Sequence, residues 1–244
     1  MTPPRGSGSG AAIRICPHGR CDGSGWIVAD DNTASGCECR DRRIARARTL
    51  GVNSVIPARY RAVSFDAPPI SNIEADRATQ PAVQAVREYV GAIDKRLDDG
   101  EGFWLMGDVG TGKTSLAMLI SKQALAAGRT VAIYSVPALL SRIRRTYDAD
   151  AGEETFLRFF ERLTSVDLLH LDDLGAERAT EWVLEQLYAI INERYEEKRA
   201  ILLTTNLDQA ELEEQIGARS ISRLVEICGH WILPLNGQDM RMVG

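Results

Sequence analysis

A glycine-rich segment between an apolar stretch and a helical pattern constrains this 244-residue chain more than any other feature. The segment reads GDVGTGKT and spans residues 107–114, after the apolar residues 103–106. A strand, then Gly-x-x-x-x-Gly-Lys-Thr, then a helix forms a P-loop, which binds the phosphates of a nucleotide. A glycine-rich turn with a chance lysine is the alternative, but the flanking patterns favour the P-loop.

Each residue type in this segment has a physical role. The glycines allow the backbone to wrap closely around phosphate oxygens. Lys113 is expected to reach the β- and γ-phosphates of ATP, and the Thr114 hydroxyl is expected to bind Mg²⁺. The predicted nucleotide-binding residues are Gly107, Asp108, Val109, Gly110, Thr111, Gly112, Lys113, Thr114 and Ser115.

Short apolar runs alternate with helical patterns from residue 103 onward. The predicted strands are 103–106, 130–135, 166–171, 200–205 and 230–235. The predicted helices are 113–127, 180–197 and segments near 137–147, 154–163 and 208–227. Such alternation predicts an α/β fold in which a parallel sheet is covered by helices on both faces.

Polar residues end two of these predicted strands. The strand at 166–171 runs into Asp172 and Asp173, which is the Walker B position. Asp172 is expected to hold Mg²⁺, and Asp173 to orient or deprotonate the attacking water. Asn206 follows the strand 200–205 and fits a sensor that holds the water or the γ-phosphate. Turn formation alone is the alternative for these residues.

Two arginines lie four residues apart on one predicted helix face. An arginine supplied by a neighbouring subunit can neutralise charge that develops on the γ-phosphate. Arg223 is the predicted finger, and Arg219 is expected to support the interface. A local salt bridge to Glu214 or Glu226 is the alternative.

Four of the five cysteines fall within 24 residues near the N-terminus. Cys16, Cys21, Cys37 and Cys39 provide enough thiolates for a tetrahedral Zn²⁺ site in a module too small to fold by apolar burial. The Cys-x-Cys spacing is tight, so His18 is an alternative to Cys16 or Cys39 as a ligand. Cys228, His170 and His230 are interpreted as core or edge residues.

Composition and charge limit the remaining possibilities. The chain is 44% hydrophobic and 26% charged, with no apolar run near the roughly 20 residues of a membrane span. We expect a cytoplasmic protein without membrane contact. Residues 1–61 carry ten Arg, no Lys and five acids, so this end is basic while the chain as a whole has a net charge of −5. A basic module suggests contact with nucleic acid or an acidic protein surface, with solvated arginines as the alternative.

The expected domain organisation has four parts. Residues 1–12 read as a disordered tail, and 13–66 as the zinc module with a helix at 40–50. Residues 67–80 contain Pro68 and Pro69 and read as an extended linker. Residues 81–244 form the ATPase core, which opens with a helix at 81–97.

Taken together, these motifs resemble AAA+ ATPases of the DnaC/DnaI type, which load the replicative helicase, and the similar transposition helper IstB. The resemblance also covers residues 56–61 (IPARYR) and 190–195 (IINERY), and extends from about Cys16 to Arg241. It implies a P-loop AAA+ sheet of order 5-1-4-3-2 without a helical lid. Asp173 departs from the pattern, because most AAA+ ATPases have Glu there.

The resemblance also implies partners. Loaders of this type carry an N-terminal zinc module that contacts a DnaB-like replicative helicase. Initiator-type AAA+ proteins have an extra helix between the second and third strands that faces DNA. Here Arg142, Arg144 and Arg145, with Tyr134 and Tyr147, are suited to contact single-stranded DNA by charge and stacking. The alternative is an amphipathic surface helix that buries Leu139, Leu140 and Ile143.

The sequence therefore predicts an ATPase, converting ATP and water to ADP and phosphate, that loads a replicative helicase onto single-stranded DNA. We expect an ATP-dependent homo-oligomer that uses hydrolysis as a release switch. One alternative is an IstB-like transposition helper that acts on duplex DNA. The other is a zinc-binding adaptor that holds ATP without useful turnover.

Overall fold

The computed structural model describes residues 16, 19–21, 26–29, 33–37, 55–147, 156–237 and 239. The chain divides into two compact units, Met1–Ala47 and Arg48–Gly244. The predicted tail at 1–12 and helix at 40–50 lie outside the described residues, as do His18 and Cys39. Among the described residues, no helix is long and apolar enough to cross a membrane.

The larger unit alternates strands with helices, as predicted. Its helices are η1 (Ala58–Tyr60), α2 (Ile70–Ala75), α3 (Gln80–Gly91), α4 (Ile93–Asp98), α5 (Lys113–Ala126), α6 (Val136–Arg145), α7 (Phe156–Ser165), α8 (Glu181–Glu196), α9 (Gln209–Ile216) and α10 (Ala218–Cys228). Its strands are β3 (Phe103–Met106), β4 (Val131–Ser135), β5 (Leu168–Asp172), β6 (Ala200–Thr205) and β7 (Ile232–Pro234).

The five strands form one parallel sheet in the order β4-β5-β6-β3-β7. Counted from β3 along the chain, this order is 5-1-4-3-2, which confirms the prediction. Met106 pairs with Thr205, and Leu171 pairs with Leu203, so β3, β5 and β6 end at the same edge. Ligands of parallel α/β sheets bind at this carboxyl edge.

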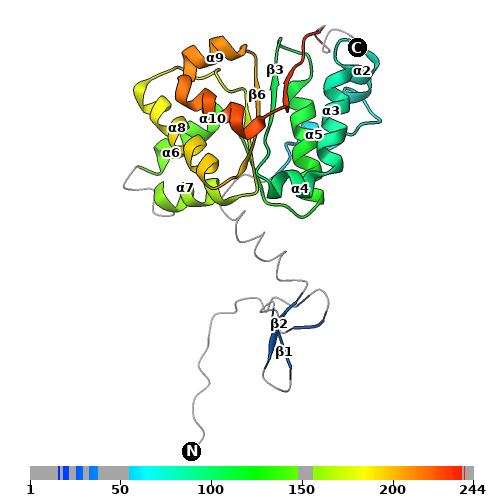
Figure 1. The fold of residues 1–244 in the computed structure, drawn as a ribbon, viewed down its shortest axis with the longest axis vertical. Helices are drawn as coiled ribbons and strands as arrows, with labels where there is room; N and C mark the ends of the chain where they lie inside the picture. Colours follow the sequence, from blue (N-terminus) through cyan, green and yellow to red (C-terminus); the bar gives the residue numbers. More distant parts are fainter. Residues whose placement is uncertain are drawn as a thin grey trace, which may run out of the picture. The chain divides into compact units, whose positions relative to one another are not determined.

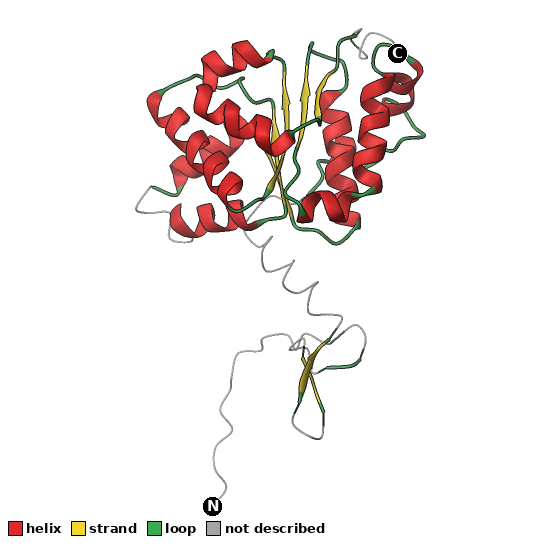
Figure 2. Ribbon diagram, in the orientation of Figure 1, coloured by secondary structure: helices red, strands yellow, loops and turns green. Residues whose placement is uncertain are grey.

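Helices cover both faces of the sheet (Figures 1 and 2). Alternate residues of each strand point to opposite faces. On one face Phe103 and Leu105 pack with α2, α3, α4 and α5, and on the other Trp104 packs with α6 to α10. The core therefore consists of two apolar layers that fix the sheet between them.

A buried arginine joins three segments at the opposite edge of the sheet. Arg194 of α8 is fully buried, and its guanidinium donates to five backbone carbonyls near the starts of β5 and β6. Burial lowers the pKa of Arg194 to about 9, so the side chain remains charged at neutral pH. Charge-assisted hydrogen bonds of this kind offset the cost of burying the cation.

Two expected boundaries were wrong. The stretch interpreted as an extended linker contains α2, because Ile70 and Ile73 are fully buried against the core rather than exposed. The helix expected at 81–97 is divided at Ala92 into α3 and α4. No helix follows β7 in residues 235–237 and 239, the part of the following chain that the structure describes.

The smaller unit contains an antiparallel pair of strands. β1 (Trp26–Val28) pairs with β2 (Ala34–Gly36), so that Trp26 lies opposite Gly36. Cys37 follows β2 directly, and Cys16 and Cys37 are buried although the strands around them are short. The burial of this unit's described residues is centred on cysteines rather than on large apolar side chains.

Candidate functional site

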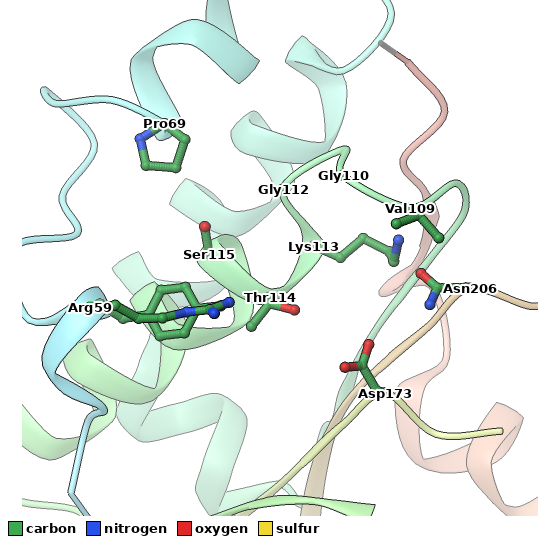
Figure 3. A pocket seen from close by; sticks show the side chains of 11 residues that line it. Arg59, Pro69, Val109, Gly110, Gly112, Lys113, Thr114, Ser115, Asp173 and Asn206 are labelled. Carbon is green, nitrogen blue, oxygen red and sulfur yellow. The ribbon is translucent and has the colours of Figure 1, made fainter. Parts of the chain in front are cut away.

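A pocket of about 570 Å³ lies at the carboxyl edge of the sheet. Figure 3 shows Lys113, Asp173 and Asn206 on one side of it, with Arg59 and Pro69 on the other. Its lining comes from four separate parts of the chain: Arg59, Tyr60, Pro69, Val109, Gly110, Gly112, Lys113, Thr114, Ser115, Asp173 and Asn206. The three predicted motifs therefore meet in one cavity.

The glycines of the P-loop are required by its backbone conformation. Gly107, Gly110 and Gly112 have φ angles of 131°, 84° and 97°, which side chains disfavour. A Cβ on Gly112 would lie 2.2 Å from Cδ1 of Ile73 in α2. The loop thus approaches its surroundings too closely to accommodate a side chain, and α5 begins at the next residue.

Lys113 is held inside the loop that precedes it. Its ammonium donates to the carbonyl of Gly107 at 2.8 Å and to that of Asp108 at 2.6 Å. The residue is only 5% exposed, although it lines the pocket. These bonds place a positive charge at the start of α5, where the backbone N–H groups and the helix dipole also favour an anion.

The last residue of β5, Asp172, and the residue after it, Asp173, face different surroundings. Asp173 lines the pocket and has a φ angle of 57°, whereas Asp172 lies outside the lining with its side chain 14% exposed. The Thr204 hydroxyl of β6 donates to Oδ1 of Asp172 at 2.7 Å and accepts from the N–H of Asp173 at 3.0 Å. One buried hydroxyl therefore fixes both predicted acids.

A histidine lies two residues before Asp172 on the same face of the sheet. His170 is fully buried, and its Nδ1 lies 2.9 Å from the Ser121 hydroxyl of α5. Its Nε2 lies 4.0 Å from Oδ1 of Asp172. Burial lowers the pKa of His170 to about 3, so the imidazole is neutral at pH 7. The sequence interpretation of a core histidine agrees with this burial.

Three pocket residues lie before the predicted core. Arg59 and Tyr60 belong to η1, and Pro69 precedes α2. Lys122 of α5 donates to the carbonyls of Arg61 and Val63, at 2.9 and 2.7 Å, which holds this segment against the P-loop helix. The family-like pattern at 56–61 was the one sequence signal for these residues, and it did not place them at the site.

The two arginines of α10 lie outside the lining of this pocket. Arg219 is exposed, whereas the Arg223 guanidinium lies over the rings of Tyr188 and Tyr195, 5.0 and 5.6 Å from their centroids. In the part of the chain that is described, Arg223 forms no ion pair with Glu214 or Glu226, so the alternative of a local salt bridge was wrong. Cation–π packing on α8 holds the side chain instead.

Three cysteines of the smaller unit converge. The sulfur atoms of Cys16, Cys21 and Cys37 all lie within 4.8 Å of one another, and those of Cys16 and Cys37 are 3.7 Å apart. Four thiolates at 2.3 Å around a tetrahedral Zn²⁺ would be about 3.8 Å apart. These three residues are therefore able to hold a metal. Burial raises the pKa of the Cys228 thiol, which lies in the core of the larger unit.

The predicted DNA-facing residues are only partly exposed. Tyr134 is 5% exposed and packs edge-to-face on Phe159, so its expected role in base stacking was wrong. Tyr147 is 53% exposed and stacks on Phe156. Arg142, Arg144 and Arg145 lie in the last turn of α6, opposite its buried residues Leu139, Leu140 and Ile143.

Comparison with known proteins places this arrangement in a family. The profile of the IstB-like ATP binding protein family matches residues 85–242. The chain belongs to this family. It is 29% identical over 193 residues to the uncharacterized protein YdaV of Escherichia coli K12, covering 79% of this chain and 74% of YdaV. It is 28% identical over 144 residues to the replicative helicase loader DnaC of Escherichia coli K12, covering 59% of this chain and 56% of DnaC.

A solved structure supports the same fold. The crystal structure of the DnaC helicase loader aligns with a TM-score of 0.62 and 24% identity, covering 75% of this chain and all of that chain. The resemblance to DnaC-type loaders and IstB-like proteins is confirmed, and the α/β fold of the AAA+ type with it. The family is ATP-binding, which agrees with a glycine cradle, a buried ammonium and two carboxylates at one sheet edge.

Replacing Lys113 tests the pocket directly. Lys113→Ala removes the ammonium, so ATP affinity is expected to fall roughly 10- to 100-fold because a charge-assisted hydrogen bond to phosphate is lost. The affinity is measured by titration with a fluorescent ATP analogue. Lys95→Ala, an exposed lysine of α4, is the control and should bind normally. Unchanged affinity in Lys113→Ala would contradict the P-loop assignment.

Proposed function

We propose that this chain is an ATPase that loads a DnaB-like replicative helicase onto single-stranded DNA and uses ATP hydrolysis as a release switch. The observation that carries the ATPase part is the meeting of Lys113, Asp173 and Asn206 in one pocket. The family is ATP-binding, and similarity to DnaC proteins supports a role related to replication. The helicase-loading part rests on these relatives.

The pocket residues and the adjacent Asp172 have separate roles in ATP hydrolysis. The Lys113 ammonium neutralises charge on the β- and γ-phosphates, and backbone N–H groups of the P-loop donate to the phosphate oxygens. Thr114 and Asp172 are the residues that would hold Mg²⁺, which would offset negative charge on the phosphates. Asp173 orients or deprotonates the attacking water, and Asn206 holds that water or the γ-phosphate.

The position of Arg223 suits a role in a neighbouring subunit. Its side chain extends from α10 over two tyrosine rings of α8 and lies outside the lining of the ATP pocket in the same chain. Within the described part of the chain, the guanidinium therefore packs against aromatic rings and is not ion-paired with a carboxylate. In an ATP-dependent homo-oligomer, Arg223 would face the γ-phosphate bound to the adjacent copy, with Arg219 at the same interface.

A surface of α6 and α7 supports contact with single-stranded DNA. Arg142 lies 4.9 Å from the ring centroid of Phe159, and Arg144 lies 4.7 Å from that of Trp182. These rings hold the arginines in place, while exposed Tyr147 offers a face for a base. Positive charge and aromatic stacking together bind single strands without reading sequence.

The cysteine unit is the proposed helicase-contacting module. Cys16, Cys21 and Cys37 supply three ligands to Zn²⁺, and Cys39 or His18 supplies the fourth. Because the described residues of this unit bury cysteines rather than large apolar side chains, metal binding provides the folding energy of the module. A small module that folds separately from the ATPase core is suited to binding another protein.

The match to the IstB-like family supports one alternative function. An IstB-like transposition helper would use the same ATP-binding core on duplex DNA. The exposed arginine and tyrosine side chains of α6 and its flank favour single strands, because stacking requires unpaired bases.

Loading is the direct test of the proposal. The source cell's replicative helicase, incubated with this chain, ATP and immobilised circular DNA, should be retained on single-stranded circles and lost when the chain is omitted. Lys113→Ala should abolish retention, and Lys95→Ala should not. Preference for duplex circles, measured by the same recovery assay, would favour the transposition helper and contradict the loader.

Zinc content tests the cysteine unit. Protein purified under reducing conditions should contain one Zn²⁺ per chain by elemental analysis, and Cys37→Ser should lose it because one of the converging thiolates is gone. Cys228→Ala removes a cysteine of the larger unit and should retain the metal. Metal-free wild-type protein would refute the zinc assignment.

Replacing Arg223 tests action across a subunit boundary. Arg223→Ala should lower ATP turnover on the order of 10³-fold, because a trans arginine stabilises the transition state, while leaving ATP affinity unchanged. Turnover is measured with single-stranded DNA present. Arg87→Ala is the control, because this arginine forms a solvent-exposed ion pair with Glu74 and lies outside the lining of the pocket.

Mixing extends the test to the interface. Arg223→Ala has an intact P-loop and Lys113→Ala has an intact arginine, so an equimolar mixture should recover some hydrolysis at interfaces where both intact parts meet. Wild-type turnover by Arg223→Ala alone would exclude the finger. A mixture without recovered activity would contradict its action in trans.

A further inference from the structure

Three fully buried polar side chains and the partly buried Asp172 form a row beneath the sheet edge. They come from three elements: Ser121 from α5, His170 and Asp172 from β5, and Thr204 from β6. Ser121, His170 and Thr204 are fully buried, and all are surrounded by apolar residues of the same layer. Buried polar groups are costly unless they are satisfied, so a row of this kind needs a reason.

The histidine at the centre of the row has one satisfied and one unsatisfied nitrogen. Nδ1 contacts the Ser121 hydroxyl at 2.9 Å, whereas Nε2 has no hydrogen-bond partner among the residues that the structure describes. Nε2 is directed to Asp172, whose Oδ1 is 4.0 Å away. This separation is longer than a hydrogen bond, so the contact is electrostatic.

The surroundings select one tautomer of the neutral ring. With the proton on Nδ1, the lone pair of Nε2 would face a carboxylate in a buried environment, which is unfavourable. With the proton on Nε2, the Ser121 hydroxyl donates to Nδ1 and the N–H points at Asp172. The Asp172 carboxylate therefore favours the Nε2–H tautomer, and the Ser121 hydroxyl satisfies Nδ1 in it and holds the ring.

We propose that His170 is a positioning residue for Asp172: its Nε2–H, directed by Ser121, orients the carboxylate that holds Mg²⁺. The proposal rests on the proposed function, because it assigns Asp172 to the metal of the ATP site. Ser121 lies on the same helix as Lys113 and Thr114, so the row links the phosphate-binding helix to the metal-binding strand. Neighbours of this kind typically contribute 10- to 100-fold to metal affinity.

Thr204 cannot perform this task alone. Its single hydroxyl hydrogen goes to Oδ1 of Asp172, while its oxygen accepts from the N–H of Asp173. One donor at one oxygen allows the carboxylate to pivot about that bond. His170 lies two residues before Asp172 on β5, and its Nε2 is 4.0 Å from the same Oδ1. A second donor on this side narrows the orientations that are open to the carboxylate.

Two substitutions separate the donor from the bulk of the ring. His170→Gln places an amide N–H₂ at the position of Nε2, whereas His170→Asn keeps a group near Nδ1 and lacks the outer donor. The measured quantity is the gain in affinity for a fluorescent ATP analogue when Mg²⁺ replaces EDTA. Urea unfolding of each full-length variant checks that it is folded.

The expected result is that the Mg²⁺-dependent gain in affinity falls while the affinity for nucleotide without Mg²⁺ stays the same. His170→Asn should lose about tenfold of the Mg²⁺-dependent gain with unchanged affinity in EDTA, and His170→Gln should remain within about threefold of wild type. Equal gains in wild type and His170→Asn, or equal losses in both variants, overturn the proposal. Absence of ATP binding by the wild type would instead contradict the proposed function.

Ser121→Ala provides a second route if the histidine variants fail to fold. It keeps the imidazole but removes the hydrogen bond to Nδ1 that holds the ring, so the Mg²⁺-dependent gain should fall while binding in EDTA is kept. A folded Ser121→Ala protein with the full gain would overturn the role of the row.

Discussion

The parallel register of β3, β5 and β6 is the constraint on which the site depends. These strands are distant in the chain, at 103–106, 168–172 and 200–205, yet they end at one level because Met106 pairs with Thr205 and Leu171 with Leu203. The P-loop, the two acids and Asn206 each begin where a strand stops. Their meeting is therefore a consequence of strand pairing, and the apolar layers on both faces keep that pairing rigid.

The second half of the pocket is built by chain that comes before the sheet. Ile73 of α2 packs where a side chain on Gly112 would otherwise lie, and Lys122 ties the carbonyls of Arg61 and Val63 to α5. The P-loop helix therefore contacts both the sheet and this preceding segment. Arg59 and Tyr60 reach the pocket because of these contacts.

Sequence patterns predicted what depends on periodicity and local motifs. The five strands, the P-loop and the polar strand ends were predicted because apolar alternation and glycine spacing are local signals. Long-range packing was not predictable in this way. The segment that forms α2 was interpreted as a linker because Pro68 and Pro69 precede it, although Ile70 and Ile73 are buried. Tyr134 was expected to stack on a base, but its ring is buried in β4 against Phe159 of α7. His170 looked like a core residue, and only its neighbours reveal its orientation.

Thr204 illustrates how a site can depend on a residue that resembles ordinary core. It sits in the run Ala-Ile-Leu-Leu-Thr-Thr, and a redesign of this strand for tighter packing would choose valine, which has nearly the same shape and suits a strand. The exchange would leave the outline of the core intact. It would also release the Asp172 carboxylate and the Asp173 backbone together, since both rely on the same oxygen. Protein engineering of this sheet must therefore treat one apparently hydrophobic position as polar.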